Sequence, residues 1–301
     1  MRGILLINKD KNMTSHDVIA ILRRKLKIKR IGHTGTLDPN VTGVLPICIG
    51  NATRVSEYIM HQGKSYECEM RFGSATTSYD SDGEITDTSD KIHFTETQIL
   101  DAFEHFTGEI EQSPPIYSAI KVKGKKLYEY ARKDIDVEIP KRKVKIYALE
   151  LLDLSGDKIR FNIDCSKGTY VRSLVHELGL YLETYAHMTS LIRTRVGKFY
   201  VSDCIPIWDI EKLSIEEIES SLRRIEDSLY NLASIRIDSG IEDRINNGQK
   251  INLDDIRYEL KLNDYNEIDY DNVVVIVRDK FMGIGKITDK VLKMERVLKS
   301  D

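Results

Sequence analysis

Two segments of the chain alternate strictly between apolar and polar residues, which is the pattern of a strand with one buried face. The first covers residues 65–72, with the apolar positions Tyr66, Cys68, Met70 and Phe72. The second covers residues 159–165, with the apolar positions Ile159, Phe161, Ile163 and Cys165. Another strand is predicted near residues 144–152, and the turn sequence Ser155-Gly156-Asp157-Lys158 predicts a hairpin with the strand that follows.

Apolar residues recur at helical spacing in four other segments. Residues 14–17 are typical of a helix start, and the apolar face that follows is Val18, Ile19, Leu22 and Leu26. Capping-box patterns at residues 95–98 and 214–217 start two more helices. Their predicted apolar faces are Ile99, Leu100, Phe103 and Phe106, and Ile215, Ile218, Leu222, Ile225 and Leu229. A turn at residues 166–169 leads into a helix that carries Leu174, Val175, Leu178 and Leu182.

The character of the sequence changes at two points. Ser113-Pro114-Pro115 interrupts regular structure, and residues 113–140 then mix tyrosines with lysines, which predicts an insertion that projects from the core. After Leu232, short apolar runs such as residues 273–277 and 281–287 predict a small β-rich domain. We therefore expect an α+β domain over residues 1–232 and a terminal domain over residues 233–301.

The chain has 301 residues and a formal net charge of −3, but its charges are unevenly distributed. Basic residues crowd two segments, namely Arg23, Arg24, Lys25, Lys27, Lys29 and Arg30, and Lys121, Lys123, Lys125, Lys126, Arg132, Lys133, Lys141, Arg142, Lys143 and Lys145. Acidic residues outnumber basic ones from Asp203 to Asp271. A basic run is either a solvated surface or part of a path for a polyanion, and composition leaves both open.

No apolar stretch is long enough to span a bilayer, and the first residues lack the features of a signal peptide. We therefore expect a cytoplasmic protein without membrane association. The four cysteines, Cys48, Cys68, Cys165 and Cys204, are widely spaced among apolar neighbours. This spacing predicts reduced, buried thiols and suggests neither a disulfide framework nor a zinc site.

Residues 32–50 place four glycines and two prolines around one acidic side chain, Asp38. Glycine permits backbone angles and close approaches that a Cβ forbids, and Pro39 keeps Asp38 out of helical geometry. We expect a shaped loop that holds the Asp38 carboxylate in place. An Asp-Pro pair is commonly a simple turn, and the surrounding glycines together with His33 favour a chemical role.

Several alternative chemistries lack their motifs. The glycine spacing matches neither the dinucleotide-binding pattern nor the P-loop, so a nucleotide cofactor is disfavoured. Residues 78–89 lack the charged end positions of a calcium loop, and His176-Glu177 lacks the second histidine of a zinc protease. No nucleophile elbow is present. A carboxylate, basic segments and aromatic residues remain, with no predicted metal or redox site.

Two further side chains have an ordinary and a functional interpretation. Arg172 lies near the start of a predicted helix, where its charge opposes the helix dipole and requires an anion. A structural carboxylate, Asp38 and an RNA phosphate are all candidates for that anion. Tyr66 lies on the apolar face of its strand, where its ring either belongs to the core or stacks at the edge of a pocket.

The motifs together resemble the TruB family of tRNA pseudouridine synthases. The resemblance lies in residues 32–39 with 42–46, in Tyr66 on its strand, and in residues 166–173 and 191–197. Further similarity covers residues 80–83, 117–121 and 124–132. The motifs occur in the family's order and cover essentially the whole of the predicted larger domain.

The resemblance implies that the chain isomerises a uridine of the tRNA T loop, at position 55, to pseudouridine without a cofactor. Asp38 is then the catalytic aspartate, Tyr66 stacks on the target uracil, and Arg172 pairs with the Asp38 carboxylate. The base is flipped out of its stack before reaction. Whether Asp38 attacks C6 of the uracil or C1′ of the ribose stays open.

The resemblance also assigns other residues and the fold. It implies that Tyr170 and Leu191 line the pocket, that His33 helps to hold the T loop open, and that Lys9 belongs to the substrate-binding residues. The expected fold is a mixed, mainly antiparallel sheet flanked by helices, with a PUA-like terminal domain. Residues 113–140 correspond to an insertion that closes over the RNA. The expected partner is tRNA, bound by a monomer that has no obligate protein partner.

The chain departs from the family pattern at two places. Lys9-Asp10-Lys11-Asn12 stands where the family has a Lys-Pro-x-Gly turn, and Ile192-Arg193 stands where it has paired arginines. Two alternative functions stay open: a tRNA-binding or folding factor with incidental catalysis, and a guide-RNA-dependent synthase that modifies ribosomal RNA. The long insertion argues against the second alternative, because guided relatives need no T-loop clamp.

Overall fold

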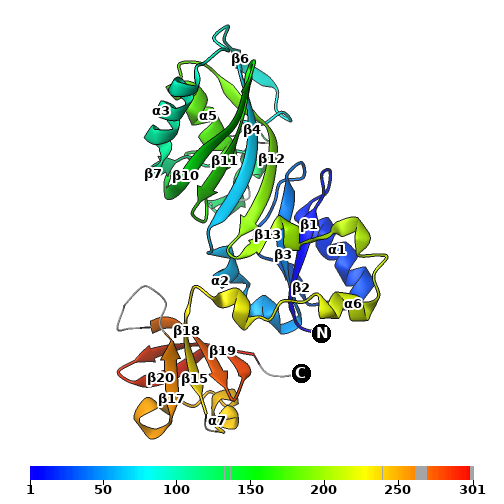
Figure 1. Ribbon diagram of the computed structural model, residues 1–301, viewed down its shortest axis with the longest axis vertical. Helices are drawn as coiled ribbons and strands as arrows, with labels where there is room; N and C mark the ends of the chain where they lie inside the picture. The colour runs from blue at the N-terminus through cyan, green and yellow to red at the C-terminus, as the bar shows by residue number, and fades with distance from the viewer. Residues whose placement is uncertain are drawn as a thin grey trace. The chain divides into compact units, whose positions relative to one another are not determined.

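Figure 1 shows the computed structural model, which describes residues 1–118, 120–131, 133, 135, 137–238, 240–261 and 270–298, with the backbone alone at Tyr128. Ala119 of the predicted insertion and Arg132 of the second basic segment lie outside the described residues. The chain divides into two compact units. Unit 1 comprises residues 1–38, 44–62 and the described residues from Ser202 onward, and unit 2 comprises residues 39–43 and the described residues of 63–201.

The elements of unit 1 that precede residue 233 are β1 (Gly3–Lys9), α1 (Ser15–Leu26), β2 (Ile31–His33), most of β3 (Thr42–Ile49), the 3-10 helix Gly50–Val55, α2 (Ser56–Met60), β14 (Ile205–Pro206), the 3-10 helix Ile207–Asp209, α6 (Ile215–Ser220) and the 3-10 helix Glu226–Leu229. β1 pairs with β14 in parallel, and β2 pairs with β3 in antiparallel fashion. The predicted start of α1 is confirmed, because Thr14 caps the helix in a capping box with Asp17.

Two expectations about unit 1 were wrong in extent. The predicted loop over residues 32–50 is shorter, because the apolar run after Thr42 forms the buried strand β3 and leaves only residues 34–41 as loop. The predicted helix over residues 214–229 ends at Ser220. Beyond it, Arg223 exchanges backbone hydrogen bonds of 2.9 and 3.0 Å with Ile4, so pairing with the edge of β1 replaces further helical turns.

The elements of unit 2 are β4 (Lys64–Phe72), β5 (Ser74–Thr76), β6 (Ile85–Thr88), α3 (Glu96–Phe106), β7 (Gly108–Gln112), β8 (Lys121–Val122), β9 (Lys125–Lys126), α4 (Leu127–Ala131), β10 (Arg142–Ser155), β11 (Lys158–Cys165), α5 (Val171–Tyr181), β12 (Ala186–Val196), β13 (Phe199–Tyr200) and the start of the 3-10 helix Val201–Asp203. Both alternating strands and the β10–β11 hairpin are confirmed. α3 packs beside β10, and α5 packs beside β12 and β4 (Figure 1).

The capping box that starts α3 is confirmed, but the predicted apolar face of this helix was wrong at Leu100, which is exposed. The buried face consists of Ile99, Ala102 and Phe103. Leu100 follows Ile99 by about 100° around a helix of 3.6 residues per turn, which turns its side chain away from that face. In the cysteine set, Cys204 was also wrongly predicted, because it is only partly buried, whereas the other three thiols are buried.

In unit 1 the strand order is β14-β1-β3, with β2 on β3, and in unit 2 it is β12-β4-β11-β10-β7, with β13 on β12. β12, β4, β11, β10 and β7 pair in antiparallel fashion, whereas β12 pairs with β3 in parallel. The expected α+β fold with a mixed, mainly antiparallel sheet is therefore confirmed. Within the described part of the chain, no helix combines the length and apolar character that crossing a membrane requires.

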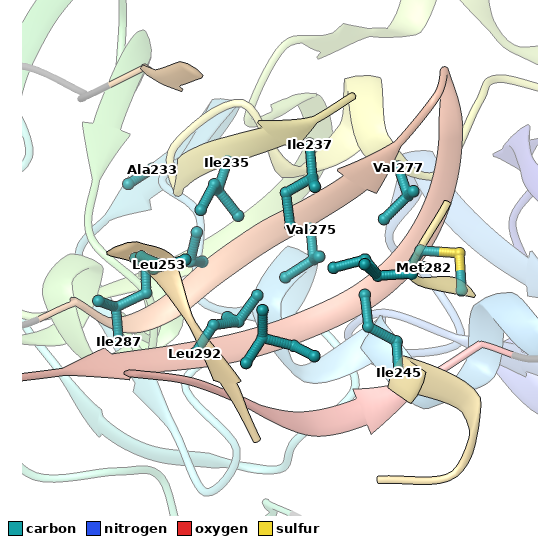
Figure 2. Close-up of a cluster of buried hydrophobic side chains, with 13 residues drawn as sticks. Ala233, Ile235, Ile237, Ile245, Leu253, Val275, Val277, Met282, Ile287 and Leu292 are labelled. Carbon is teal, nitrogen blue, oxygen red and sulfur yellow. The ribbon is translucent and has the colours of Figure 1, made fainter. Parts of the chain in front are cut away.

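The last part of the chain forms a separate six-stranded sheet, in the order β16-β20-β19-β18-β15-β17. Its elements are β15 (Ala233–Ile237), α7 (Glu242–Asn246), β16 (Ile251–Asn252), the 3-10 helix Leu253–Asp255, β17 (Tyr258–Lys261), β18 (Tyr270–Val277), β19 (Lys280–Thr288) and β20 (Val291–Val297). Figure 2 shows its core, in which Ile235, Val275 and Leu292 are fully buried. The β-rich character of this segment is confirmed, and a PUA-type domain that begins at residue 233 stays a prediction.

Gly43 pairs with Arg193 where β3 meets β12. Its φ is +106°, and a Cβ placed on it would lie 2.8 Å from Arg193 N and closer still to the Arg193 carbonyl oxygen. We expect Gly43→Ala to destabilise the protein by about 3 kcal/mol or more, because neither backbone can move without breaking the pairing. Urea denaturation measures this loss.

Gly156 provides the matched control for that prediction. Its φ is +61°, but a Cβ there has no heavy atom within 4 Å. Gly156→Ala therefore adds only the left-handed backbone strain, about 1 kcal/mol. Equal losses of stability in the two variants would contradict the steric explanation for Gly43.

Candidate active site

Asp38 lies within the loop of residues 34–41 between β2 and β3 and is partly exposed. The preceding residue, Leu37, is buried, and both of its backbone polar groups bond to the hydroxyl of Ser15 in α1. Thr34, the first residue of the loop, donates its N–H to the Pro46 carbonyl at 3.0 Å. The backbone before Asp38 is therefore fixed to α1 and to β3, while Asp38 itself is partly exposed.

His33 is the last residue of β2 and is partly exposed. Its ring meets that of His16 edge to face, with the ring centroids 5.5 Å apart and an angle of 84° between the planes. Its Nδ1 accepts the N–H of Gly35 at 3.3 Å. His33 is thus held from two sides at the start of the Asp38 loop.

Lys9 is fully buried, and its Nζ donates to the carbonyls of Asp10 at 2.8 Å and Met13 at 2.7 Å. These bonds close the turn between β1 and α1, where the chain departs from the family pattern. Asn12 takes the left-handed φ of 59° for which glycine is usually chosen. The Asp10 carboxylate accepts the Trp208 indole N–H at 2.9 Å, which lowers the pKa of Asp10. A direct contact of Lys9 with substrate stays a prediction.

Tyr66 lies on β4, between β12 and β11, and is 9% exposed. It pairs with Arg193 of β12, and Cys68, two residues further along β4, pairs with Leu191. Residues directly opposite in an antiparallel pair lie on the same face, and diagonal neighbours lie within reach of an aromatic ring. The structure therefore brings Tyr66 and Leu191 together on one face of the sheet.

Two buried cations share that face. Lys64 precedes Tyr66 by two residues and is 7% exposed, and Arg193 is 2% exposed. Burial, reinforced by the charges of Arg193 and Lys167, lowers the pKa of Lys64 to about 8. The alternating pattern gave no sign of Lys64, because a lysine at the first position of a strand is usually read as exposed.

Arg172 is the second residue of α5 and is 5% exposed. Its guanidinium donates to the carbonyls of Ser78 at 3.1 Å and Tyr117 at 2.9 Å, and lies 3.4 Å from the Asp80 carboxylate. A carboxylate thus meets Arg172 within unit 2, as the helix dipole requires. The additional pairing of Arg172 with Asp38 stays a prediction.

Tyr170 directly precedes α5 and is partly exposed. Its backbone exchanges two hydrogen bonds with the buried side chain of Gln112: the Tyr170 N–H donates to Oε1 at 2.8 Å, and its carbonyl accepts from Nε2 at 3.0 Å. The Arg142 guanidinium lies 5.6 Å from the centre of the Tyr170 ring. Gln112 therefore fixes the start of α5, from which both Tyr170 and Arg172 project.

Tyr79 and His176 were missed by sequence reasoning. Their rings stack with centroids 4.0 Å apart and planes 11° apart, and Tyr79 has the unusual φ of 63°. His176 follows Arg172 by one helical turn, so both side chains lie on one face of α5. This face of α5 contacts the loop around Tyr79 through both Arg172 and His176. The i, i+4 spacing of these two residues was the feature of the sequence that could have linked them.

Glu177, the neighbour of His176, is partly buried, and burial raises its pKa from 4.5 to about 7 against the opposing charge of Lys141. Because the pKa of Glu177 is higher in the folded state, its protonation contributes to the free energy of unfolding. This contribution is fully present below pH 4.5 and is lost as the pH rises through 7. Glu177→Gln removes this titration. We expect the variant to gain stability over the parent with rising pH, by on the order of 1 kcal/mol after solvent screening.

Unfolding free energies measured between about pH 5 and pH 8 check this prediction. Glu104→Gln, at an exposed position of α3, is the matched control, because it makes the same chemical change without removing a partly buried carboxyl group. A stability difference between Glu177→Gln and the parent that stays constant across this range would contradict the burial argument.

The sequence matches two family models. Residues 23–171 match the model described as "TruB family pseudouridylate synthase (N terminal domain)". Residues 172–229 match the model described as "tRNA pseudouridylate synthase B C-terminal domain".

Relatives named "tRNA pseudouridine synthase B" resemble most of the chain. The one from Geobacillus thermodenitrificans is 46% identical over 86% of this chain and 89% of its own. The one from Clostridium perfringens (strain ATCC 13124) is 40% identical over 99% of both chains.

Solved structures have a similar fold. One titled "Crystal structure of the archaeal box H/ACA sRNP Nop10-Cbf5 complex" has a TM-score of 0.74 at 25% identity, over 98% of this chain and 85% of that chain. One titled "Structure of H/ACA RNP bound to a substrate RNA containing 2'-deoxyuridine" has a TM-score of 0.75 at 24% identity, over 99% of this chain and 85% of that chain, and supports the fold alone. With both family models matched and relatives of 40% identity or more spanning the chain, this protein belongs to the TruB family of pseudouridylate synthases.

Proposed function

We propose that this protein converts a uridine in the T loop of tRNA, at position 55, to pseudouridine. The observation that carries the proposal is the identity with relatives named "tRNA pseudouridine synthase B", which reaches 40% over 99% of the chain. In this proposal the protein works in the cytoplasm as a monomer and uses no cofactor. Its substrate-binding residues are Tyr66, Arg172, Tyr170, His33, Leu191 and Lys9.

Asp38 is the catalytic nucleophile in this proposal. The reaction breaks the glycosidic C–N bond, rotates the uracil and joins it to the ribose through C5, so it needs neither a redox change nor an energy source. A carboxylate that is held in place can start it by attack at C6 or at C1′. The fixed backbone at Leu37 and the partial exposure of Asp38 support this role.

Tyr66 receives the flipped base. Extruding a stacked nucleotide costs a few kcal/mol, and stacking on an aromatic ring returns about 1–3 kcal/mol. Leu191 lies on the same face as Tyr66 and supplies an apolar contact for the uracil. Phosphate contacts from basic residues then offset the remaining cost of base flipping.

The two basic segments contribute unequally to RNA binding in this proposal. In the first segment, Arg24 forms an ion pair with Glu211 at 2.8 Å, and Lys25 donates to the Glu211 carbonyl at 2.9 Å. These contacts reduce the charge that α1 offers to a polyanion. The second segment, which includes the exposed residues Lys121 and Lys125 of the insertion, is therefore the stronger candidate for binding the T-loop backbone.

A map of pseudouridine at nucleotide resolution, in unmodified tRNA incubated with the purified protein, tests the proposal. One new pseudouridine at position 55 is the expected result. No new pseudouridine, or one at another position alone, would overturn it.

A guide-RNA-dependent synthase is the second candidate, because a solved structure of similar fold is titled as a box H/ACA particle. The discriminating condition is the absence of any added RNA or protein. Activity on tRNA alone supports the stand-alone enzyme, whereas activity that requires a guide RNA supports the alternative.

A further inference from the structure

Two consecutive residues in the first turn of α1 contact the chain just before the Asp38 loop and within it. Ser15, which is 1% exposed, accepts the N–H of Leu37 at 2.9 Å and donates to the Leu37 carbonyl at 3.3 Å. His16 packs its ring edge to face with that of His33, at 5.5 Å between centroids. Leu37 immediately precedes Asp38, and His33 precedes the loop.

The hydroxyl of Ser15 satisfies two backbone groups that lie outside any regular element. Leu37 is 4% exposed, so its N–H and carbonyl have little access to water. A buried backbone polar group needs a hydrogen-bond partner, and loops usually find theirs in solvent. At Leu37, one side chain 22 positions earlier in the sequence serves both groups.

α1 is itself a fixed reference for these contacts. Thr14 and Asp17 form a complete capping box at its start, and Lys9 Nζ donates to the carbonyl of Met13 just before it. The apolar face of the helix, with Val18 and Leu22 fully buried, anchors it in the core. A displacement of Ser15 relative to the core would therefore disturb several contacts at once.

We propose that Ser15 is a positioning residue for Asp38. The inference rests on the proposed role of Asp38 as the nucleophile. A misplacement of a reacting group by about 1 Å can cost a rate factor of about 100, so a hydroxyl that holds the adjacent peptide acts on the chemical step. Binding of tRNA, which uses many contacts, depends little on it.

The test compares Ser15→Ala with the matched control Asp17→Ala. The control breaks the capping box of the same helix start and leaves the contacts of the Ser15 hydroxyl in place. Three quantities are measured for each variant: the thermal midpoint, hydrogen exchange at the Leu37 amide, and the single-turnover rate together with the Kd for tRNA.

For Ser15→Ala we expect faster exchange at Leu37 and a rate lowered by about tenfold or more, with the Kd for tRNA within about twofold. For Asp17→Ala we expect a lower thermal midpoint with the exchange at Leu37 and the rate close to those of the parent. Unchanged exchange at Leu37 in Ser15→Ala would overturn the proposal, as would equal rate losses in the two variants. Failure of the proposed function can be distinguished from failure of this inference. In the first case the parent protein makes no pseudouridine, and the hydrogen exchange at Leu37 still decides whether Ser15 holds Leu37.

Discussion

Replacing Asp38 with asparagine is expected to lower the rate of pseudouridine formation by more than about a thousandfold, equivalent to about 4 kcal/mol of lost transition-state stabilisation. Asparagine has the shape of aspartate but is no nucleophile at neutral pH. Leu37 before it stays bonded to Ser15, so the loop keeps its backbone. Tritium release from C5-labelled uridine in tRNA measures the rate, and filter binding should give a Kd for tRNA close to that of the parent.

Asp101→Asn is the matched control for this prediction, because it makes the same chemical change on the exposed face of α3. It should keep the full rate. A parental rate in Asp38→Asn would remove Asp38 from the mechanism. Equal complementation of a deletion strain by the parent and by Asp38→Asn would instead favour the alternative in which the protein serves as a tRNA-binding or folding factor.

Helix starts could be predicted from the sequence because their determinants are local. The capping boxes at Thr14, Thr95 and Ser214 all lie at the predicted positions. The end of α6 could not be predicted, because it depends on a bridge between Arg223 and Ile4, which are far apart in the sequence. The loop between β2 and β3 was predicted too long for a related reason. The glycine and proline within residues 42–49 are typical of a loop, but pairing and burial stabilise this segment as a strand.

The residues of the candidate site also differ in whether they could be predicted from their sequence neighbours. Asp38 could be singled out because its glycines and prolines are its immediate neighbours in the sequence. Asp80 could not be matched with Arg172, since 91 positions separate them and only the packing of α5 brings them together. Lys64 escaped notice because its burial depends on β11 and β12, which flank β4. The sequence therefore identified residues whose role depends on their immediate neighbours, but not contacts between residues that are far apart in the chain.

Loss of the Arg172 side chain is expected to cost several kcal/mol of stability, more than loss of a comparable but exposed arginine in unit 2. The Arg172 guanidinium joins the loop at Ser78 and Asp80 to the Tyr117 carbonyl of the predicted insertion. Asp80 is in turn bonded to the Ser78 hydroxyl and to the Asp82 N–H, so it stays in place when the arginine is removed. Arg172→Met therefore leaves a largely buried carboxylate and two carbonyls without this donor, at a cost of about 3–5 kcal/mol in unfolding free energy.

Arg195→Met is the matched control, because Arg195 also pairs with a carboxylate in unit 2, at 2.6 Å from Asp164, but both partners are more exposed. Its loss should cost about 1 kcal/mol or less. In Arg172→Met/Asp80→Asn we expect less than the sum of the single losses, with a coupling of about 0.5–3 kcal/mol, because the second change removes the charge that the first exposed. Chemical denaturation of Arg172→Met, Asp80→Asn, the double variant and Arg195→Met measures these free energies. Equal costs at Arg172 and Arg195 would show that burial adds nothing to this ion pair.

Arg172→Lys separates the charge of Arg172 from its geometry. Lysine keeps the positive charge but cannot present the planar fork that serves Ser78 and Tyr117 together. If Arg172 acts only through its charge near Asp80, this variant keeps the parental single-turnover rate. If it acts by holding the Ser78 loop and the insertion in register, the rate falls by about 100-fold even though the net charge is unchanged. We expect the second result, because the guanidinium donates to the Ser78 and Tyr117 carbonyls in addition to facing the Asp80 carboxylate.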